Sequence, residues 1–136
     1  MPISIKNEEE IKNIRISGKI LGEVLKESCK IAKAGISTFE IDRFAEKLIL
    51  EKGGIPAFKG YNGFPCTLCT SINDEIVHGI PGKNKILKNG DLLTLDGGVI
   101  YKGMYSDAAR SIGIGQISEE KERLIKTAKE ALNRAI

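Results

Sequence analysis

Residues 94–111 read TLDGGVIYKGMYSDAARS and place two carboxylates, Asp96 and Asp107, in a stretch that is otherwise apolar and rich in turn residues. If both side chains reach one buried face, like charges force one of them to protonate unless a cation neutralises the pair. Two divalent ions about 3.5–4 Å apart suit such a pair. Two carboxylates are too few for a dinuclear centre, which needs further His, Asp or Glu ligands.

The position of the turn decides whether the two carboxylates meet. An Asp-Gly pair is a strong hairpin signal, so one interpretation puts the turn at residues 96–97 and makes Asp96 a turn residue. The alternative puts the turn at residues 102–103, which sets Gly98 opposite Asp107 and leaves Asp96 on the same face. The two aspartates are then diagonal neighbours with backbones roughly 7–8 Å apart. Local residue preferences leave both interpretations open.

Three other features of this region could carry chemistry or structure. His78, the one histidine of the sequence, stands in NDEIVHGIPG, where a predicted strand runs into a Gly-Pro turn. Loops at strand ends often carry function, although a lone histidine also fits a structural or exposed role. The stretch FKGYNGFP over residues 58–65 is either a packed loop or the wall of an apolar pocket. Cys66 and Cys69 form CTLC, but three cysteines in all cannot complete a pair of such motifs around zinc, and we interpret them as semi-buried thiols.

The elements that must position these residues follow from periodicity. A first helix is expected over residues 8–33 after the cap at Asn7, with this apolar stripe: Ile11, Ile14, Gly18, Leu21, Leu25 and Ala32. A second helix is expected from Ser37, whose STFE is a capping box, and a third over residues 118–136. Strands are expected near residues 66–72, 75–78, 91–101 and 104–114. The predicted fold class is α+β, an antiparallel sheet with two helices on one face, in a single domain over residues 1–136.

Composition limits the class of protein. The chain has 136 residues with a net charge of +3, too mild to indicate nucleic-acid readout, and Lys83, Lys85 and Lys88 are explained by a solvated loop. No stretch approaches the roughly 20 apolar residues of a membrane span, and no signal peptide is visible. Three cysteines without an export signal indicate reduced thiols in the cytoplasm.

Two blocks, FKGYNGFPCTLCTSINDEIVHGIPG and LKNGDLLTLDGGVIYKGMYSDAARS, resemble the type I methionine aminopeptidases, as does the N-terminal ISIKNEEEIKNIRISGKI. The resemblance implies a pita-bread fold, in which two pseudo-symmetric α+β halves enclose a dinuclear metal site. Residues 1–115 would form the first half, and residues 118–136 the first helix of the second. A weak similarity between the helix starts at Asn7 and Ser118 agrees with this division.

The resemblance also implies roles for seven residues. Asp96 and Asp107 match two metal ligands, for two divalent ions of Co, Mn, Fe or Zn. His78 matches the histidine that contacts the substrate and assists the leaving amine. Three positions match the wall of the methionine side-chain pocket, with a fourth beside them: Tyr61, Phe64, Cys69 and Phe58. The implied activity is removal of the initiator methionine from nascent proteins with a small second residue, which suggests proximity to the ribosome.

The chain departs from the family pattern in ways that matter for activity. The remaining ligands of the family are a histidine and two glutamates from the second half, so we expect this chain alone to be inactive and to self-associate. Asn62 stands where many relatives carry histidine. The sequence YSDAARS is more similar to aminopeptidase P and prolidase, so a fragment of such a peptidase is one alternative. A non-catalytic binding module on the same fold is another.

Overall fold

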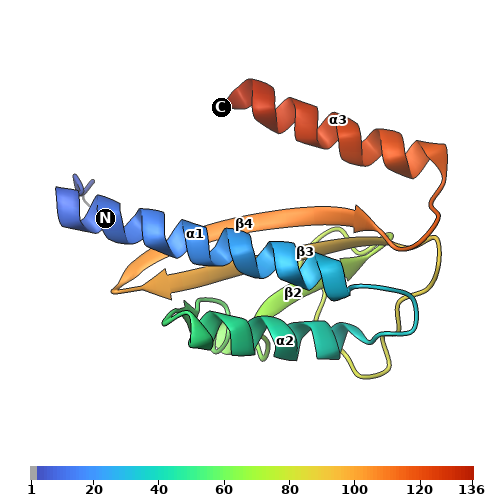
Figure 1. The fold of residues 1–136 in the computed structure, drawn as a ribbon, viewed down its shortest axis with the longest axis horizontal. Coiled ribbons are helices and arrows are strands. Elements are labelled where there is room, and N and C mark those ends of the chain that lie inside the picture. Colours follow the sequence, from blue (N-terminus) through green and yellow to red (C-terminus); the bar gives the residue numbers. More distant parts are fainter. Residues whose placement is uncertain (1–2) are drawn as a thin grey trace.

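The computed structural model describes residues 3–136, which form three long helices and a four-stranded antiparallel sheet (Figure 1). The helices are α1 (Glu8–Ile31), α2 (Thr38–Glu51) and α3 (Glu119–Ala135), with a short 3-10 turn, η1 (Tyr61–Gly63). The strands are β1 (Ile55–Pro56), β2 (Leu68–Ile72), β3 (Leu92–Tyr101) and β4 (Met104–Gly113). Among these residues no helix is both long and apolar enough to cross a membrane. The predicted α+β class is confirmed.

The helices begin where the capping signals predicted. At α1 the Asn7 side chain accepts from the Glu10 amide while the Glu10 carboxylate accepts from the Asn7 amide. Ser37 and Glu40 repeat this reciprocal box at α2. Each box satisfies two backbone donors that a helix start otherwise leaves without partners.

The buried face of α1 differs from the predicted stripe. Leu21 is buried as expected, but Ile11 and Gly18 are exposed, and polar Ser17 is completely buried instead. The Ser17 hydroxyl donates to the Val99 carbonyl oxygen at 2.8 Å, so β3 supplies the partner that makes this burial tolerable. The face of α1 that meets the sheet is therefore rotated relative to the apolar pattern.

The β3–β4 hairpin settles the question of the turn. Lys102 and Gly103 both adopt positive φ, at 46° and 77°, as a tight hairpin turn requires. Gly98 pairs with Asp107, as predicted for a turn at residues 102–103. Asp96 lies inside β3, so its interpretation as a turn residue is wrong.

The two faces of β3 have different surroundings. Leu93, Leu95 and Val99 are fully buried against α1 and α2, which lie on one side of the sheet in Figure 1. Because side chains alternate along a strand, Asp96 and Gly98 face the opposite side. The apolar core thus holds β3 in place while the other face presents the carboxylate.

Residues 75–78 are irregular, so the predicted strand there is wrong. Ile76 and Val77 resemble a strand in composition, but both side chains are exposed. His78 adopts a φ of +59°, which interrupts any extended conformation. The other three predicted strands are confirmed, with β2 shorter than expected by two residues at its start.

Candidate active site

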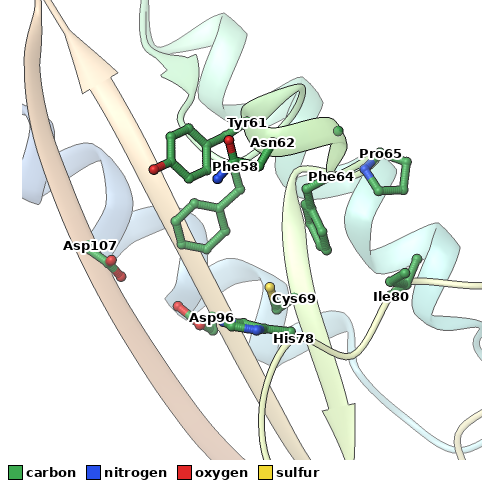
Figure 2. Close-up of a pocket in the computed structure, with 11 residues that line it drawn as sticks. Phe58, Tyr61, Asn62, Phe64, Pro65, Cys69, His78, Ile80, Asp96 and Asp107 are labelled. Atoms are coloured by element: carbon green, nitrogen blue, oxygen red, sulfur yellow. The ribbon is translucent and has the colours of Figure 1, made fainter.

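A cavity of about 610 Å³ lies on the face of the sheet opposite α1 and α2. All seven residues singled out in the sequence line it (Figure 2): Phe58, Tyr61, Phe64, Cys69, His78, Asp96 and Asp107. These residues come from three strands, β2, β3 and β4, from the loop before β2 and from the irregular segment after it. The fold therefore gathers residues up to 49 positions apart at one site.

The two aspartates approach the cavity from adjacent strands. Asp107 faces Gly98 across the β3–β4 ladder, and Asp96 lies two residues from Gly98 on the same face. Burial raises the pKa of the Asp96 carboxyl, and the negative charge of Asp107 raises it further, with His78 acting in the opposite direction. A cation between the carboxylates would relieve this mutual repulsion.

His78 and Cys69 lie beside Asp96 in Figure 2. Cys69 is the direct β2 partner of Asp96, and His78 is near enough to influence the Asp96 carboxylate. Burial raises the pKa of the Cys69 thiol to about 11, with smaller contributions from the charges of Asp96 and Asp107. At neutral pH the Cys69 thiol is therefore protonated and adds an uncharged group to the cavity wall.

The aromatic wall is built by a loop that folds on itself. The Gly60 amide donates to the Phe64 carbonyl oxygen at 2.8 Å, and Asn62 at the tip adopts a left-handed φ of 47°. A Cβ atom on Gly98 would lie 2.8 Å from Phe58 Cε1, so only glycine lets this ring lie against β3. The ring of Phe58 thus borders the gap between the two carboxylates.

Helix α2 anchors both ends of this loop. Asp42, only 3% exposed, accepts from the backbone amides of Thr67 and Leu68 at 2.9 and 2.8 Å. One turn later Glu46 accepts from the Lys59 ammonium near the start of the loop. Burial raises the pKa of Asp42 even though both amide bonds favour its ionised form. The pocket wall is thereby fixed to a helix of the core.

The metal-ligand set is small. Asp96 and Asp107 offer oxygen donors on one face, which suits a divalent cation. Within residues 3–136, no group of three or more His, Cys, Asp or Glu side chains is placed to hold a metal ion. Cys66 and Cys69 are both buried and free, and they form no such group with the aspartates.

Sequence reasoning missed several contributors. The cavity is also lined by Ile80, which was not predicted, and by three residues of the stretch 58–65 that were given no role as pocket residues of their own: Asn62, Gly63 and Pro65. An Asn-Gly pair is a turn signal, and this could have placed Asn62 at the loop tip. No local signal identifies Asp42, because its partners lie 25 and 26 residues away in the sequence.

Comparison with known proteins adds independent information. The sequence model of metallopeptidase family M24 matches residues 12–136. A methionine aminopeptidase of Clostridium acetobutylicum is 48% identical over 134 residues, which are 98% of this chain and 54% of that protein. The chain thus spans about half the length of the curated relatives it matches.

Solved structures agree on the fold. The methionine aminopeptidase of Thermotoga maritima superposes with a TM-score of 0.97 at 34% identity, over 99% of this chain and 54% of that one. The prolidase of Pyrococcus furiosus superposes with a TM-score of 0.84 at 25% identity, over 97% of this chain and 37% of that one. The predicted pita-bread architecture is confirmed by these likenesses.

Proposed function

The chain belongs to metallopeptidase family M24, and from this premise we propose that it supplies the side-chain pocket and two metal ligands of a methionyl aminopeptidase. The observation that carries the proposal is the single cavity that gathers both aspartates, His78 and the aromatic loop. The identity of 48% to a methionine aminopeptidase, against 25% to a prolidase, favours N-terminal methionine over Xaa-Pro substrates.

The pocket suits the side chain of methionine. Phe58 and Phe64 are half-buried and Tyr61 is exposed at the rim, so the wall presents aromatic rings to an entering side chain. Cys69 adds a protonated thiol at the base. A thioether makes favourable contacts with aromatic rings, worth about 0.3–1.5 kcal/mol each. In this proposal the pocket selects the first residue of nascent proteins in the cytoplasm, near the ribosome.

Asp96 and Asp107 would hold one or two divalent ions, drawn from Co, Mn, Fe and Zn. The bound metal would polarise the scissile carbonyl and stabilise the negative charge that develops on its oxygen. The chain's own contribution is placement, since β3 and β4 fix the two carboxylates beside the pocket that holds the side chain. Substrate and ions would thereby meet at one end of the cavity.

His78 would act on the departing amine. Its exposed ring borders the cavity beside Asp96 and can donate an N–H to the scissile amide nitrogen or pass it a proton. Asp96 stays acceptor-only when ionised, so it cannot replace this donor.

We also propose that the 136-residue chain alone has little or no peptidase activity. Two carboxylates are the whole ligand set that residues 3–136 bring together, whereas the family resemblance requires a histidine and two glutamates more. The sequence holds one histidine, which already has another proposed role. The exposed apolar side chains of α3, among them Leu124 and Leu132, would drive self-association. If light scattering shows a monomer at high concentration, the proposed self-association is wrong.

Two titrations of isotope-labelled protein test the proposal. L-methioninamide should shift the amide resonances of residues 58–69, and L-lysinamide at the same concentration should not. Mn²⁺ should broaden resonances around Asp96 in the wild type, and Asp96→Ala should remove most of that broadening. Binding of methioninamide without any effect of Mn²⁺ would favour a non-catalytic binding module. A stronger response to an Xaa-Pro dipeptide than to methioninamide would favour a prolidase-type peptidase.

A further inference from the structure

The segment that carries His78 has little apolar packing of its own. Ile76 and Val77, which precede His78, are 88% and 62% exposed. Burial of side chains therefore does not explain why residues 75–80 adopt one conformation beside the cavity. Polar contacts must fix the segment instead.

The backbone at His78 is in an unfavourable region. Its φ of +59° is left-handed, which a residue with a Cβ atom adopts only when its surroundings hold it there. On its C-terminal side Gly79 is bound to β2, because its carbonyl oxygen accepts from the Thr70 amide at 2.7 Å. A Cβ atom on Gly79 would lie 2.3 Å from the Thr70 oxygen, so no larger residue allows this approach.

Lys85 connects the two sides of His78. Its Nζ donates to Glu75 Oε1 at 2.6 Å and to the Ile80 carbonyl oxygen at 3.4 Å. These partners lie three residues before His78 and two residues after it. Glu75 Oε2 accepts from the Ile72 amide at 2.9 Å, which ties the same carboxylate to the end of β2.

The charge balance at Glu75 agrees with this link. Partial burial would raise the Glu75 pKa, but the Lys85 hydrogen bond, the Ile72 amide and the Lys85 charge together lower it. Glu75 is thus held in the ionised form that an ammonium group prefers.

The backbone of Lys85 is held in place by hydrogen bonds. Its carbonyl oxygen accepts from the Thr38 amide at 2.9 Å, at the start of α2, and its amide donates to the Gly82 oxygen. The side chain is 31% exposed, whereas Lys88 is exposed. The interpretation of the lysine cluster as a merely solvated loop is therefore wrong for Lys85.

We propose that Lys85 is a positioning residue for His78, acting through Glu75 and the Ile80 carbonyl to hold the imidazole at the cavity beside Asp96. The consequence for catalysis rests on the function proposed above for His78. The geometric claim concerns this chain alone and is tested without activity. It predicts that neutralising Lys85 loosens His78, whereas neutralising Lys88 does not.

The experiment uses the 136-residue protein and nuclear magnetic resonance. His78 is the one histidine in the sequence, so its ring gives a single Hε1 signal. In Lys85→Met the order parameter of the His78 amide should fall from about 0.85 to below about 0.6, and the Hε1 signal should move. The matched variant Lys88→Met removes the same charge three residues away and should leave both unchanged. Lys85→Arg should restore the wild-type values, since guanidinium can reach the same two acceptors.

Four results would overturn the proposal: a mobile His78 in the wild type, an ordered His78 in Lys85→Met, an equal effect of Lys88→Met, or failure of Lys85→Arg to restore order. If Lys85→Met does not fold, Glu75→Gln replaces it and should loosen His78 in the same direction, and an unchanged His78 there would contradict the proposal. The Mn²⁺ titration described above distinguishes the proposed metal function from the positioning of His78 by Lys85. If Mn²⁺ has no effect, the metal function is wrong, but the effect of Lys85 on His78 is unaffected.

Discussion

On one side of β3, four of the five residues of β2 are buried, while on the other side, within residues 3–136, none of the ten residues of β4 is buried. The helices next to these two strands differ in burial in the same way. Behind β2, Asp42 and Glu46 of α2 fix the aromatic loop at both ends. Beside β4 lies α3, a helix without a buried residue in the described chain.

This contrast distinguishes two parts of the site. The pocket wall is tied to buried Asp42 through the Thr67 and Leu68 amides, so contacts within the described residues help to set its shape. The carboxylates are divided between the two regions, with Asp96 half-buried in β3 and Asp107 exposed on β4. In the proposed function, the side-chain pocket therefore rests on the buried region, whereas the proposed metal ligands extend to an exposed strand.

The largest effect is expected from breaking the foundation of the pocket. Asp42→Ala leaves the buried Thr67 and Leu68 amides without an acceptor, so the free energy of unfolding should fall by roughly 2–4 kcal/mol. Urea denaturation measures this loss. Glu51→Ala, at an exposed position of the same helix, should change stability by less than about 0.5 kcal/mol. A loss below about 1 kcal/mol for Asp42→Ala would mean that α2 does not anchor the loop.

A smaller effect is expected where the pocket meets the carboxylates. In Gly98→Ala the new methyl group would lie 2.8 Å from Phe58 Cε1 and 2.9 Å from Ala57 Cβ. Displacement of the ring should cost about 1–3 kcal/mol in unfolding free energy and weaken methioninamide binding. In Gly22→Ala on α1 the new methyl would meet no side chain and no other segment of the described chain within 4 Å, apart from its chain neighbours, so the change should be neutral or stabilising by up to about 1 kcal/mol. Equal stability changes in the two variants would show that Gly98 is not needed for the Phe58 ring.

The same contrast separates what sequence predicts from what it does not. Once the turn is set at residues 102–103, which local preferences left open, the hairpin register follows from local rules, because a two-residue turn and strict alternation fix which side chains share a face. That is why Asp96 and Asp107 could be placed together. The cap at Asn7 and the capping box at Ser37 were equally local predictions, and both are confirmed.

Features that depend on distant partners were missed. Ser17 is buried because β3 offers a carbonyl oxygen 82 residues away, and no periodicity rule anticipates this. The segment 75–78 has the composition of a strand, but His78 adopts a positive φ, and the contacts around it come from β2, which binds Gly79, and from Lys85, which binds Glu75. Tertiary contacts override local preference at the places where the site is assembled.

The smallest expected effect is the electrostatic influence of the two aspartates on the pKa of Cys69 in the pocket wall. The pKa of Cys69 is raised from 9.0 to about 11, first by burial and then by the charges of Asp96 and Asp107. The neutral thiol is favoured in the fold, so this contribution to stability is complete below pH 9.0 and is lost as the pH rises toward about 11.

Alkylation of Cys69, followed by mass spectrometry across this pH range, measures the shift. Asp107→Asn should move the onset of alkylation to lower pH, though not as far as the ordinary thiol value, because burial remains. Asp74→Asn removes an exposed carboxylate outside the cavity and should leave the onset unchanged. An onset insensitive to Asp107→Asn would mean that the two carboxylates do not share an electrostatic environment with the pocket.

Release of methionine from a Met-Ala-Ser peptide is the decisive measurement, because we propose a side-chain pocket beside a metal site that lacks most of its ligands. The pure 136-residue protein is incubated with the peptide and Mn²⁺ or Co²⁺, with and without a chelator. No release above the rate of an Asp96→Ala control is expected under any of these conditions. Release that the chelator abolishes and that Asp96→Ala lacks would contradict this expectation, since the chain would then hold a working metal centre of its own.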